Sequence, residues 1–502
     1  MPAQQTDRAT ASATATAHPS SRTATRLFIG GAWVDPAAGE SFEATNPATG
    51  GAIGRIALGR RDDARQAIEA ARAAAPGWAR TTPFERAAAL ERVAAVIESR
   101  KDALARALTE DQGKPLLAEA HGEVEELILY VRMAAADATR IDGLLPPSVD
   151  PDKRVLIYRV PKGVVGVITP WNWPYTMPAE LVAPALAAGN TVVWNPARLT
   201  SACAVALAEC FADANLPAGV FNLVTGPGDE VGDELAANAG TAAVGFIGSG
   251  RTGASIAQRG AGKELLLEMG GNGPLVILDD ADLDAAVTAT LEACFLNAGQ
   301  SCTAGERVLV DQRVHRAYVD RLVEAVRSRV RLGDPLEAAT TMGPLNNERT
   351  AAKTERQIGE AVADGAALLH GGHRAPRFGS PLFFEPTVLD RVTEPMTIAR
   401  EETFGPVVPI TAIDGEAEAL RLIDESPSGL LAAVFTRDLR RGMAFAESAR
   451  AGWVNINEGT NYWESHLPFG GRAGSQSGLG RVGGRFSIER LTELKTIVVN
   501  LA

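Results

Sequence analysis

The chain has 502 residues, of which 46% are hydrophobic and 22% charged, and its formal net charge is −12. These proportions are typical of a globular protein and exclude a wholly disordered chain. An acidic surface repels phosphate backbones and no Lys/Arg run is present, so no nucleic-acid partner is expected. No apolar run approaches the ~20 residues that span a bilayer, so no membrane partner is expected either.

The first 25 residues are rich in Ala, Thr and Ser and lack the apolar core of a secretory signal. We expect residues 1–25 to form a disordered tail, with a transit peptide as the alternative that their composition leaves open. Four cysteines are too few for a disulfide scaffold in a chain of this length, which favours a cytoplasmic protein. No metal site is predicted.

In chain order, residues 27–33 alternate like an edge strand, and apolar residues at helical spacing predict helices over 62–75, 83–105 and 123–136. From residue 159 short apolar runs alternate with helical stretches. Strands are expected at 164–168, 191–194, 221–224, 243–247 and 265–267, and helices at 178–188, 202–214, 230–237 and 252–259. This alternation is typical of βαβ units in a parallel sheet covered on both faces.

A second alternation of the same kind follows in the C-terminal half. It consists of predicted strands at 274–278, 307–310, 407–413, 430–436 and 452–457, with helices at 283–297 and 316–330. The fold class is therefore α/β, with two layered α/β units in tandem.

Cys302 lies in a Gly-flanked turn after the helix predicted at 283–297. A nucleophilic thiol needs a lowered pKa and nearby backbone N–H groups that can hold an oxyanion, and such a turn can supply both. The alternative, a small buried hydrophobe, applies equally to a lone cysteine and is our reading of Cys203, Cys210 and Cys294 on their helix faces.

Residues 248–253 match G-x-G-x-x-G between a predicted strand and a predicted helix, as a dinucleotide-binding turn requires. Such turns also recur without nucleotides in α/β folds. An acidic residue about 20 positions further on would be the ribose ligand of this motif, and Glu268 stands there. Because Glu268 ends a strand, it is also a candidate for a base held in a cleft, and the motif leaves both roles open.

Residues 169–175, Thr-Pro-Trp-Asn-Trp-Pro-Tyr, follow the strand predicted at 164–168. Prolines fix the backbone there, aromatic rings shape a pocket, and the Asn172 amide is a good donor to a developing oxyanion. The alternative is a rigid aromatic turn whose asparagine satisfies its own loop.

Taken together, these segments resemble the aldehyde dehydrogenase superfamily from about residue 26 to the C-terminus. The matching segments, in family order and spacing, are 170–172, 187–193, 221–226, 248–249, 268–271, 299–302, 402–406 and 468–471. The resemblance implies an aldehyde dehydrogenase-like fold of two Rossmann-like α/β domains plus a small β oligomerisation element. The implied division is a cofactor-binding domain at 26–141 and 163–270, a catalytic domain at 271–471, and an arm at 142–162 and 484–502.

The resemblance also implies a mechanism for the oxidation of an aldehyde to a carboxylic acid. Cys302 is then the nucleophile, and Asn172 with the Cys302 backbone N–H holds the oxyanion. Hydride leaves for NAD or NADP, and Glu268 activates the water that hydrolyses the thioester. Relatives that transfer the acyl group to CoA, or that form aldehydes, usually lack this glutamate. An enzyme of one of these two kinds remains an alternative to the hydrolytic aldehyde dehydrogenase. A non-catalytic binding protein with this fold is the alternative outside the enzymes.

The implied cofactor-binding residues lie on several segments: Trp171, Asn195, Arg198, Gly226, Gly248, Ser249, Glu402 and Phe404. Where the family commonly has Lys-Pro-x-Glu, this chain has Asn195-Pro-Ala-Arg198. The usual glutamate repels a 2′-phosphate, whereas Arg198 can pair with one. The sequence therefore leaves NAD and NADP both open, with an Arg198 that simply faces water as the alternative.

The residues matching the family's substrate pocket are Trp173, Met177, Glu180, Ser301, Thr303 and Trp463. Two indoles and a methionine favour an apolar or aromatic aldehyde, or a cationic one, and Glu180 is expected at the rim, where it would disfavour a second carboxylate. Leu181 and Val482 replace a charged pair that the family often carries near the base, so Glu268 is expected to titrate differently. The loop at 472–476 is longer than usual.

Family members form dimers or tetramers. The matching hairpin at 142–162 and the apolar C-terminal strand at 494–501 therefore predict a homodimer or homotetramer, since an unpaired apolar edge strand promotes aggregation.

Overall fold

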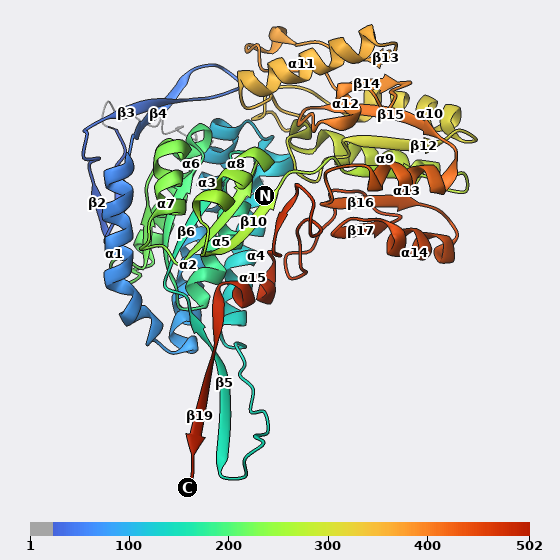
Figure 1. Cartoon of the computed structure of the whole chain (residues 1–502). Helices are drawn as coiled ribbons and strands as arrows, with labels where there is room; N and C mark the ends of the chain where they lie inside the picture. The colour runs from blue at the N-terminus through green and yellow to red at the C-terminus, as the bar shows by residue number, and fades with distance from the viewer. Residues whose placement is uncertain (1–23) are drawn as a thin grey trace, which may run out of the picture.

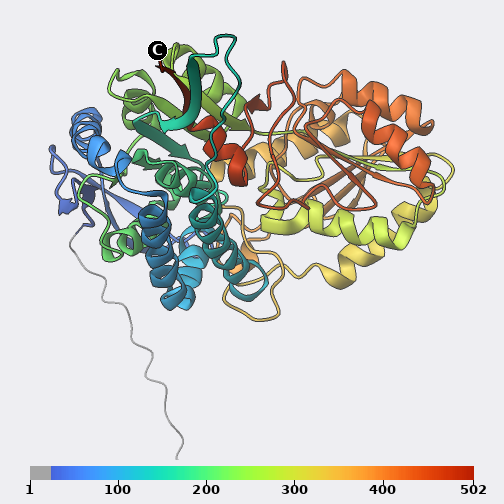
Figure 2. The ribbon, with the colours of Figure 1, turned by 90° about the horizontal axis from the view of Figure 1, so that it is seen from below.

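The computed structural model describes residues 24–502, so nearly all of the predicted N-terminal tail lies outside the described residues. Two α/β units lie side by side, each built around a largely parallel sheet, and a long two-stranded arm extends from the first unit (Figure 1). Viewed along a perpendicular direction, the blue-to-green unit and the mainly yellow-to-orange unit lie next to each other, and the red C-terminal segment returns to the first unit (Figure 2). The α/β fold class predicted from the sequence is confirmed.

The sheet of the first unit is built on the strands predicted between residues 164 and 267. Its order is β18 (Gly478–Leu479), β10 (Glu264–Met269), β9 (Ala243–Gly248), β6 (Val164–Thr169), β7 (Thr191–Pro196), β8 (Phe221–Leu223), β1 (Leu27–Ile29) and β2 (Ala32–Val34). The strands from β10 to β8 run parallel, and the outer ones join antiparallel. Strand β6 is buried along its whole length, as a central parallel strand must be.

Helices cover both faces of this sheet. Alternate residues of β6 separate the two hydrophobic clusters: Val165 and Val167 pack on one side, Val164 and Ile168 on the other. On the first side lie α2 (Pro83–Ser99), α3 (Lys101–Gln112), α4 (His121–Ala138), α5 (Thr176–Ala187) and α6 (Ser201–Asp213). On the second lie α1 (Arg61–Ala79), α7 (Asp233–Ala237) and α8 (Gly250–Arg259).

The second unit repeats this plan. Its sheet has the order β13 (Ala367–His370), β14 (Thr387–Asp390), β15 (Val407–Ile413), β12 (Arg307–Asp311), β11 (Pro274–Ile277), β16 (Leu431–Phe435) and β17 (Trp453–Ile456). One face packs on α9 (Leu283–Phe295), α10 (His315–Arg329) and α11 (Glu348–Ala363), the other on α13 (Gly415–Asp424) and α14 (Leu439–Ser448). The strands and helices predicted for this half are confirmed, but α11, α13 and α14 were not predicted.

Several elements differ from the sequence prediction in their boundaries. The helix predicted over 83–105 is two helices, because the backbone leaves the helical region at Arg100 (φ −114°, ψ 13°). Residues 27–33 form a hairpin rather than one strand, since Gly30 and Gly31 both adopt positive φ in the turn. The antiparallel pair β3 (Ser41–Thr45) and β4 (Ala52–Ala57) was also not predicted.

The arm consists of β5 (Lys153–Pro161) and β19 (Thr492–Asn500), paired antiparallel over their full length. It extends well away from both sheets (Figure 1), and Leu494, Val498 and Val499 on β19 are exposed.

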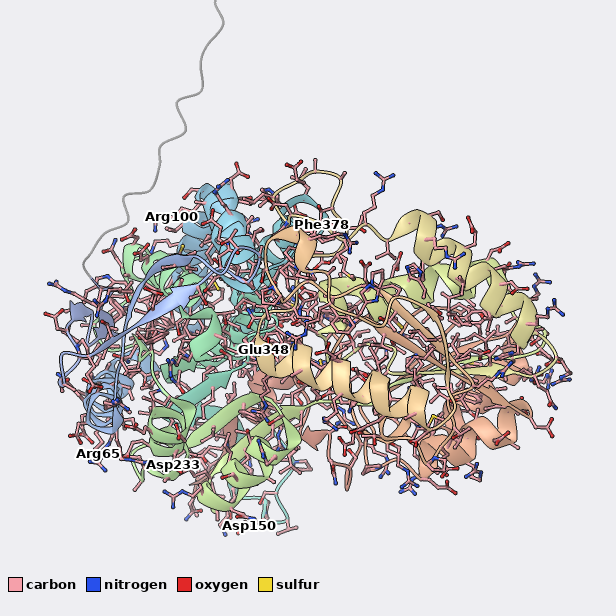
Figure 3. The ribbon with its side chains drawn as sticks, turned by 90° about the horizontal axis from the view of Figure 1, so that it is seen from above. Arg65, Arg100, Asp150, Asp233, Glu348 and Phe378 are labelled. Atoms are coloured by element: carbon pink, nitrogen blue, oxygen red, sulfur yellow. The ribbon has the colours of Figure 1, made fainter. Side chains whose placement is uncertain are left out.

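Charged side chains point outward over both units (Figure 3). One cluster links α1 to α7, where Arg61 pairs with Asp233 at 2.8 Å and Arg65 with Glu234 at 3.1 Å. No helix within residues 24–502 has both the length and the apolar character needed to cross a membrane.

Gly478 in β18 provides a test of how the sheet edge supports the site. It has φ +128°, and a Cβ there would lie 2.1 Å from the Leu267 carbonyl oxygen, beside Glu268. We expect Gly478→Ala to lower the free energy of unfolding by about 1–3 kcal/mol, as measured by urea titration. Gly474→Ala is the matched control, because Gly474 also has positive φ (+78°) but nothing lies within 4 Å of its Cβ position. If both variants lost the same free energy of unfolding, the predicted clash at position 478 with the Leu267 carbonyl would be contradicted.

Candidate active site

A cavity of about 590 Å³ lies where the two units meet, at the carboxyl ends of β6, β9 and β10. In an open parallel sheet this is the edge at which ligands bind. The structure brings together here all three predicted catalytic residues and most of the predicted cofactor residues. They are Asn172, Glu268 and Cys302, with Trp171, Gly248, Ser249, Glu402 and Phe404.

The loop that carries Cys302 is held in an unusual backbone conformation. After α9, Asn297 and Ala298 adopt positive φ (52° and 53°), followed by Gly299 at 74°. Such strain persists only when its surroundings fix it. Here the Asn297 backbone N–H donates to the Glu119 carboxyl at 3.0 Å, and its side-chain amide donates to the carbonyls of Asn172 (2.9 Å) and Gln300 (3.0 Å).

Asn172 lies at the end of β6 in the predicted aromatic turn and is buried. Its amide nitrogen donates to the Gln300 carbonyl at 3.1 Å, which joins the turn to the Cys302 loop. An amide nitrogen has two N–H groups, so one remains for a ligand oxygen in the cavity.

Glu268, on β10, is buried, and its Oε1 atom has no hydrogen-bond partner. Burial raises its pKa well above the usual range, and the nearby carboxyls of Glu180 and Glu402 raise it further. Burial also raises the pKa of the Cys302 thiol, with Glu268 as the largest charged contributor. The Cys302 thiol therefore lacks the lowered pKa that the sequence led us to expect, because it is buried and its neighbours are carboxyl groups rather than cations.

The predicted substrate residues meet in an inner cavity beyond Cys302. This cavity of about 10 Å³ is lined by Tyr130, Trp173, Met177, Glu180, Glu268, Ser301, Cys302, Thr303, Trp463 and Phe469. The Trp173 and Trp463 rings meet edge to face with centroids 6.0 Å apart. The expectation that Glu180 lies at the rim is wrong: only 5% of it is exposed, because α5 packs fully inside the first unit. Burial raises the pKa of Glu180 to about 8.

Lys114 lies behind this wall and was not predicted from the sequence. It is fully buried, pairs with Glu123 at 2.5 Å, and places its Nζ atom 3.2 Å from the centroid of the Trp173 ring. Glu123 thus balances the lysine charge, while the lysine fixes the far face of the indole. No local sequence pattern marks this contact, because it depends on how α3, α4 and the aromatic turn pack together.

The segment 402–404 is anchored by two further residues that sequence reasoning missed. The buried Glu306 carboxylate accepts from the Thr403 and Phe404 N–H groups at 2.7 and 2.8 Å, and Lys353 donates to the Glu402 carbonyl at 3.1 Å. Phe404, held at φ +58°, meets Trp171 edge to face at 5.6 Å. The Glu402 Oε1 atom is buried without a hydrogen bond, and a Cβ at Gly270 would lie 2.5 Å from it.

The predicted glycine-rich turn joins β9 to α8 as expected. Ser249 caps α8, with its side chain accepting from the Thr252 N–H. Gly253 permits close packing, since a Cβ there would lie 2.0 Å from the Met269 sulfur. The turn leaves the start of α8 open to the cavity, where a phosphate can meet backbone N–H groups.

Three predicted cofactor residues do not line this cavity. Asn195 is buried and donates to the carbonyls of Val224 (2.9 Å) and Gly226 (3.4 Å), so its amide is used within the fold. Gly226 lies behind it. Arg198 is exposed and lies over the Phe42 ring at 4.8 Å, without an ion pair in the described part of the chain.

Two differences from the usual family sequence lie near Glu268: the apolar pair Leu181 and Val482, and the longer loop at 472–476. Leu181 and Val482 are both buried in the cluster that contains α5, so no charge is stranded there. The longer loop at 472–476 packs on the turn after α13: the Arg472 N–H donates to the Gly429 carbonyl and the Gln476 N–H to that of Pro427. Ser477 then donates to the Gly270 carbonyl at 3.0 Å, which ties the loop to the strand of Glu268.

A thiol, an unpaired carboxyl and an amide donor share one cavity that continues to a glycine-rich helix start. These features define a nucleotide-dependent oxidoreductase that works through a cysteine. The model of the aldehyde dehydrogenase family matches residues 33–497, and the chain belongs to that family.

Its relatives agree with this assignment. A 3-sulfolactaldehyde dehydrogenase of Pseudomonas putida is 40% identical over 94% of this chain and 96% of its own. The NADP(+) succinate-semialdehyde dehydrogenase GabD of Escherichia coli is 39% identical over 95% and 98%. The structure of a Staphylococcus aureus betaine aldehyde dehydrogenase with NAD+ has a TM-score of 0.92 at 33% identity, over 96% of each chain. The protein is thus an NAD(P)-dependent aldehyde dehydrogenase that makes carboxylic acids.

Proposed function

We propose that Cys302 attacks the aldehyde, that Asn172 and the Cys302 backbone N–H hold the resulting oxyanion, and that Glu268 is the general base. The observation that carries this proposal is the buried Glu268 carboxyl, whose Oε1 atom has no hydrogen-bond partner, in the cavity that holds Cys302 and the Asn172 amide. A base with an elevated pKa suits proton transfer near neutral pH. The same carboxyl argues against the CoA-acylating and aldehyde-forming alternatives. The presence of Cys302, Asn172 and Glu268 together argues against a non-catalytic protein.

The steps follow from these positions. Glu268 takes the thiol proton as the Cys302 sulfur bonds to the carbonyl carbon, and the oxyanion forms between the Asn172 amide and the Cys302 N–H. The nicotinamide supplies an acceptor for the hydride that leaves this carbon, which yields a thioester on Cys302. Glu268 first releases the thiol proton to solvent. It then takes a proton from water as the water oxygen attacks the thioester, and returns it to the Cys302 sulfur as the carbon–sulfur bond breaks and the carboxylic acid leaves.

The chain's residues fit such a cofactor. The orphaned Glu402 Oε1 is an acceptor for ribose hydroxyls, and Trp171 and Phe404 form an apolar wall beside it. The start of α8, with Gly248 and Ser249, faces the same cavity and suits pyrophosphate.

Replacing Glu268 tests its assignment as the base. We expect Glu268→Gln to lower kcat by about 10²- to 10⁴-fold, because the amide cannot accept the proton of water. The measurement is steady-state growth of reduced-nicotinamide absorbance. Cys302→Ala should abolish turnover.

The pH profile provides the control for this variant. Since the pKa of Glu268 is raised, its basic form appears only at higher pH, so wild-type kcat should rise with pH through neutrality. The Gln variant should lose that rise. A Glu268→Gln enzyme with unchanged kcat and an unchanged profile would contradict the assignment.

We propose that NADP is accepted as well as NAD, with Arg198 as the partner of the 2′-phosphate. The supporting observation is that Arg198 is exposed and has no ion pair within residues 24–502. Arg198 itself lies outside the cavity lining, but Arg251, Arg349 and Lys353 line the cavity, whereas its carboxyls, Glu268 and Glu402, belong to the nicotinamide end.

Reversing the charge at Arg198 tests this proposal. We expect Arg198→Glu to raise the KM for NADP at least about tenfold, because a charge-assisted pair is replaced by repulsion, and to leave the KM for NAD within a few-fold. Arg440→Ala is the matched control, since Arg440 is another exposed arginine, on α14. Equal changes for both cofactors would contradict it.

We propose an aromatic or cationic aldehyde as substrate, rather than the acidic aldehydes named for the first two relatives above. No Arg or Lys lines the inner cavity among the described residues, whereas Glu180 and Glu268 do. Glu126 is a further nearby carboxyl, accepting from the Thr176 hydroxyl at 3.0 Å. The indole rings attract a cation. The Glu180 and Glu268 carboxyls, whose pKa values burial raises, would ionise beside a cation but offer a carboxylate substrate no counter-charge.

A matched pair of aldehydes of equal length tests this preference, one ending in trimethylammonium and the other in carboxylate. We expect kcat/KM to be at least about tenfold higher for the cation, and Glu180→Gln to reduce that ratio because one carboxyl is lost. For a neutral aldehyde of the same length, kcat/KM should change little between the wild-type and Glu180→Gln enzymes. A preference for the carboxylate aldehyde would contradict the proposal.

We propose that residues 26–141 with 163–270 act as the cofactor-binding domain and residues 271–471 as the catalytic domain. We further propose that the arm at 142–162 and 484–502 joins copies of the chain into a homodimer or homotetramer. Supporting this are the extended β5–β19 ribbon and its exposed apolar side chains, which a partner would cover. The four free cysteines agree with a cytoplasmic location.

Truncating β19 tests the arm. We expect light scattering at micromolar concentration to report a dimer or tetramer for the whole chain and a smaller species after deletion of residues 494–502, because the exposed edge is lost. Val498→Asp is a point variant with the same expected direction. A monomeric whole chain would contradict the proposal.

A further inference from the structure

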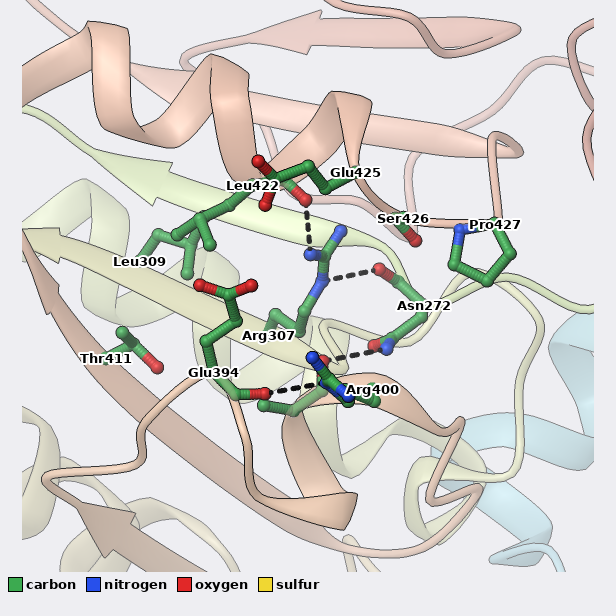
Figure 4. A pocket seen from close by; sticks show the side chains of 11 residues that line it. Asn272, Arg307, Leu309, Glu394, Arg400, Thr411, Leu422, Glu425, Ser426 and Pro427 are labelled. Atoms are coloured by element: carbon green, nitrogen blue, oxygen red, sulfur yellow. Dashed lines mark hydrogen bonds between the residues drawn. The ribbon is translucent and has the colours of Figure 1, made fainter.

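A second cavity, of about 480 Å³, lies in the second unit and shares no lining residue with the reaction site (Figure 4). Strands β12 and β15 form its floor, and α12 (Thr397–Arg400) and the turn after α13 form its walls. The lining residues are Asn272, Arg307, Leu309, Glu394, Ala399, Arg400, Thr411, Leu422, Glu425, Ser426 and Pro427.

Arg307 is the unusual group in this cavity. It is only 9% exposed, yet no carboxylate within residues 24–502 lies within ion-pair distance of it. Its Nε atom donates to the Asn272 carbonyl at 3.0 Å and its Nη1 atom to the Leu422 carbonyl at 2.9 Å, while Nη2 has no protein partner among residues 24–502 (Figure 4). Buried guanidinium groups are ordinarily paired with an anion.

A second guanidinium without an ion pair, that of the exposed Arg400, lies in the same cavity beside the Asn272 amide. Arg400 donates through Nε to the Glu394 carbonyl at 3.1 Å and has no ion pair within the described residues. Asn272 is buried, with its amide nitrogen on the Ala399 carbonyl at 3.2 Å and its Oδ1 atom unpartnered.

The two glutamates at the rim do not neutralise these arginines. Both Glu394 and Glu425 contact Arg421 instead, at 3.4 and 2.6 Å. Burial without a counter-charge lowers the pKa of Arg307 to about 10, so it remains protonated at neutral pH.

We propose that this cavity binds the oxyanion group, carboxylate or phosphate, of a small metabolite, held by Arg307 and Arg400. A planar guanidinium with a free nitrogen is suited to both groups. The site adjoins the reaction chamber without opening into it. Arg307 holds the Asn272 carbonyl, four residues after Glu268, and Ala399 and Arg400 stand just before Glu402.

The test is calorimetric titration of the whole enzyme with inorganic phosphate and, separately, with malonate. NADP is kept saturating so that the cofactor cavity is filled, and chloride keeps the ionic strength constant. We expect saturable binding of at least one probe, and the probe that binds distinguishes a phosphate from a carboxylate ligand. Arg400→Ala should weaken binding at least tenfold and retain basal turnover, which shows that the variant folds.

Arg440→Ala is the matched control, because Arg440 is exposed on α14 and does not line the cavity. Arg307→Lys keeps the charge but loses the free Nη2 donor, and should weaken binding as well. Failure of both probes to bind saturably would overturn the proposal. If the Arg400→Ala and Arg440→Ala enzymes bound the probe equally well, the bound probe would be an adventitious ion only, and this result would also overturn the proposal.

Discussion

The reaction chamber depends on carboxyl groups buried together without a contacting cation. Glu180, Glu268 and Glu402 surround Cys302, and burial raises the pKa of all three. Leu181 and Val482 pack in the neighbouring apolar cluster, so no charge lies there, and Lys353 lowers the pKa of Glu402 only in part. Burial thus raises the pKa of Glu268, the base we propose, and also the pKa of the Cys302 thiol, so the thiol stays protonated until a base takes its proton.

The surrounding fold holds these groups in position at some structural cost. The Cys302 loop passes through three consecutive residues with positive φ, and Glu119, Asn172 and Gln300 satisfy the hydrogen bonds of Asn297 at its start. On the other side Glu306 holds the backbone of 403 and 404 through two short hydrogen bonds. Buried carboxylates that accept backbone N–H groups therefore fix both walls of the cavity.

The sequence was sufficient to predict the parallel strands and the residues at their carboxyl ends, because short β-branched runs bounded by Gly and Pro rarely form anything other than buried strands. Several motifs had to be taken together to predict that Cys302, Glu268 and Asn172 lie in one cavity, and their catalytic roles stay predictions. It could not predict Lys114 or Glu306, whose partners are set by packing between distant segments. It misplaced Glu180 because a charge on a helix is ordinarily exposed, and here α5 is buried on every side.

The direct test of this account is the pH dependence of Cys302 alkylation by iodoacetamide in the enzyme without cofactor, followed by peptide mass. Burial, together with the surrounding carboxyl groups, predicts an apparent thiol pKa clearly above that of free cysteine, about 8.5, and a lower value in the Glu268→Gln enzyme. A wild-type pKa at or below that of free cysteine would contradict the account, since it would require a cation or an anion-stabilising contact that the carboxyl-lined chamber does not provide.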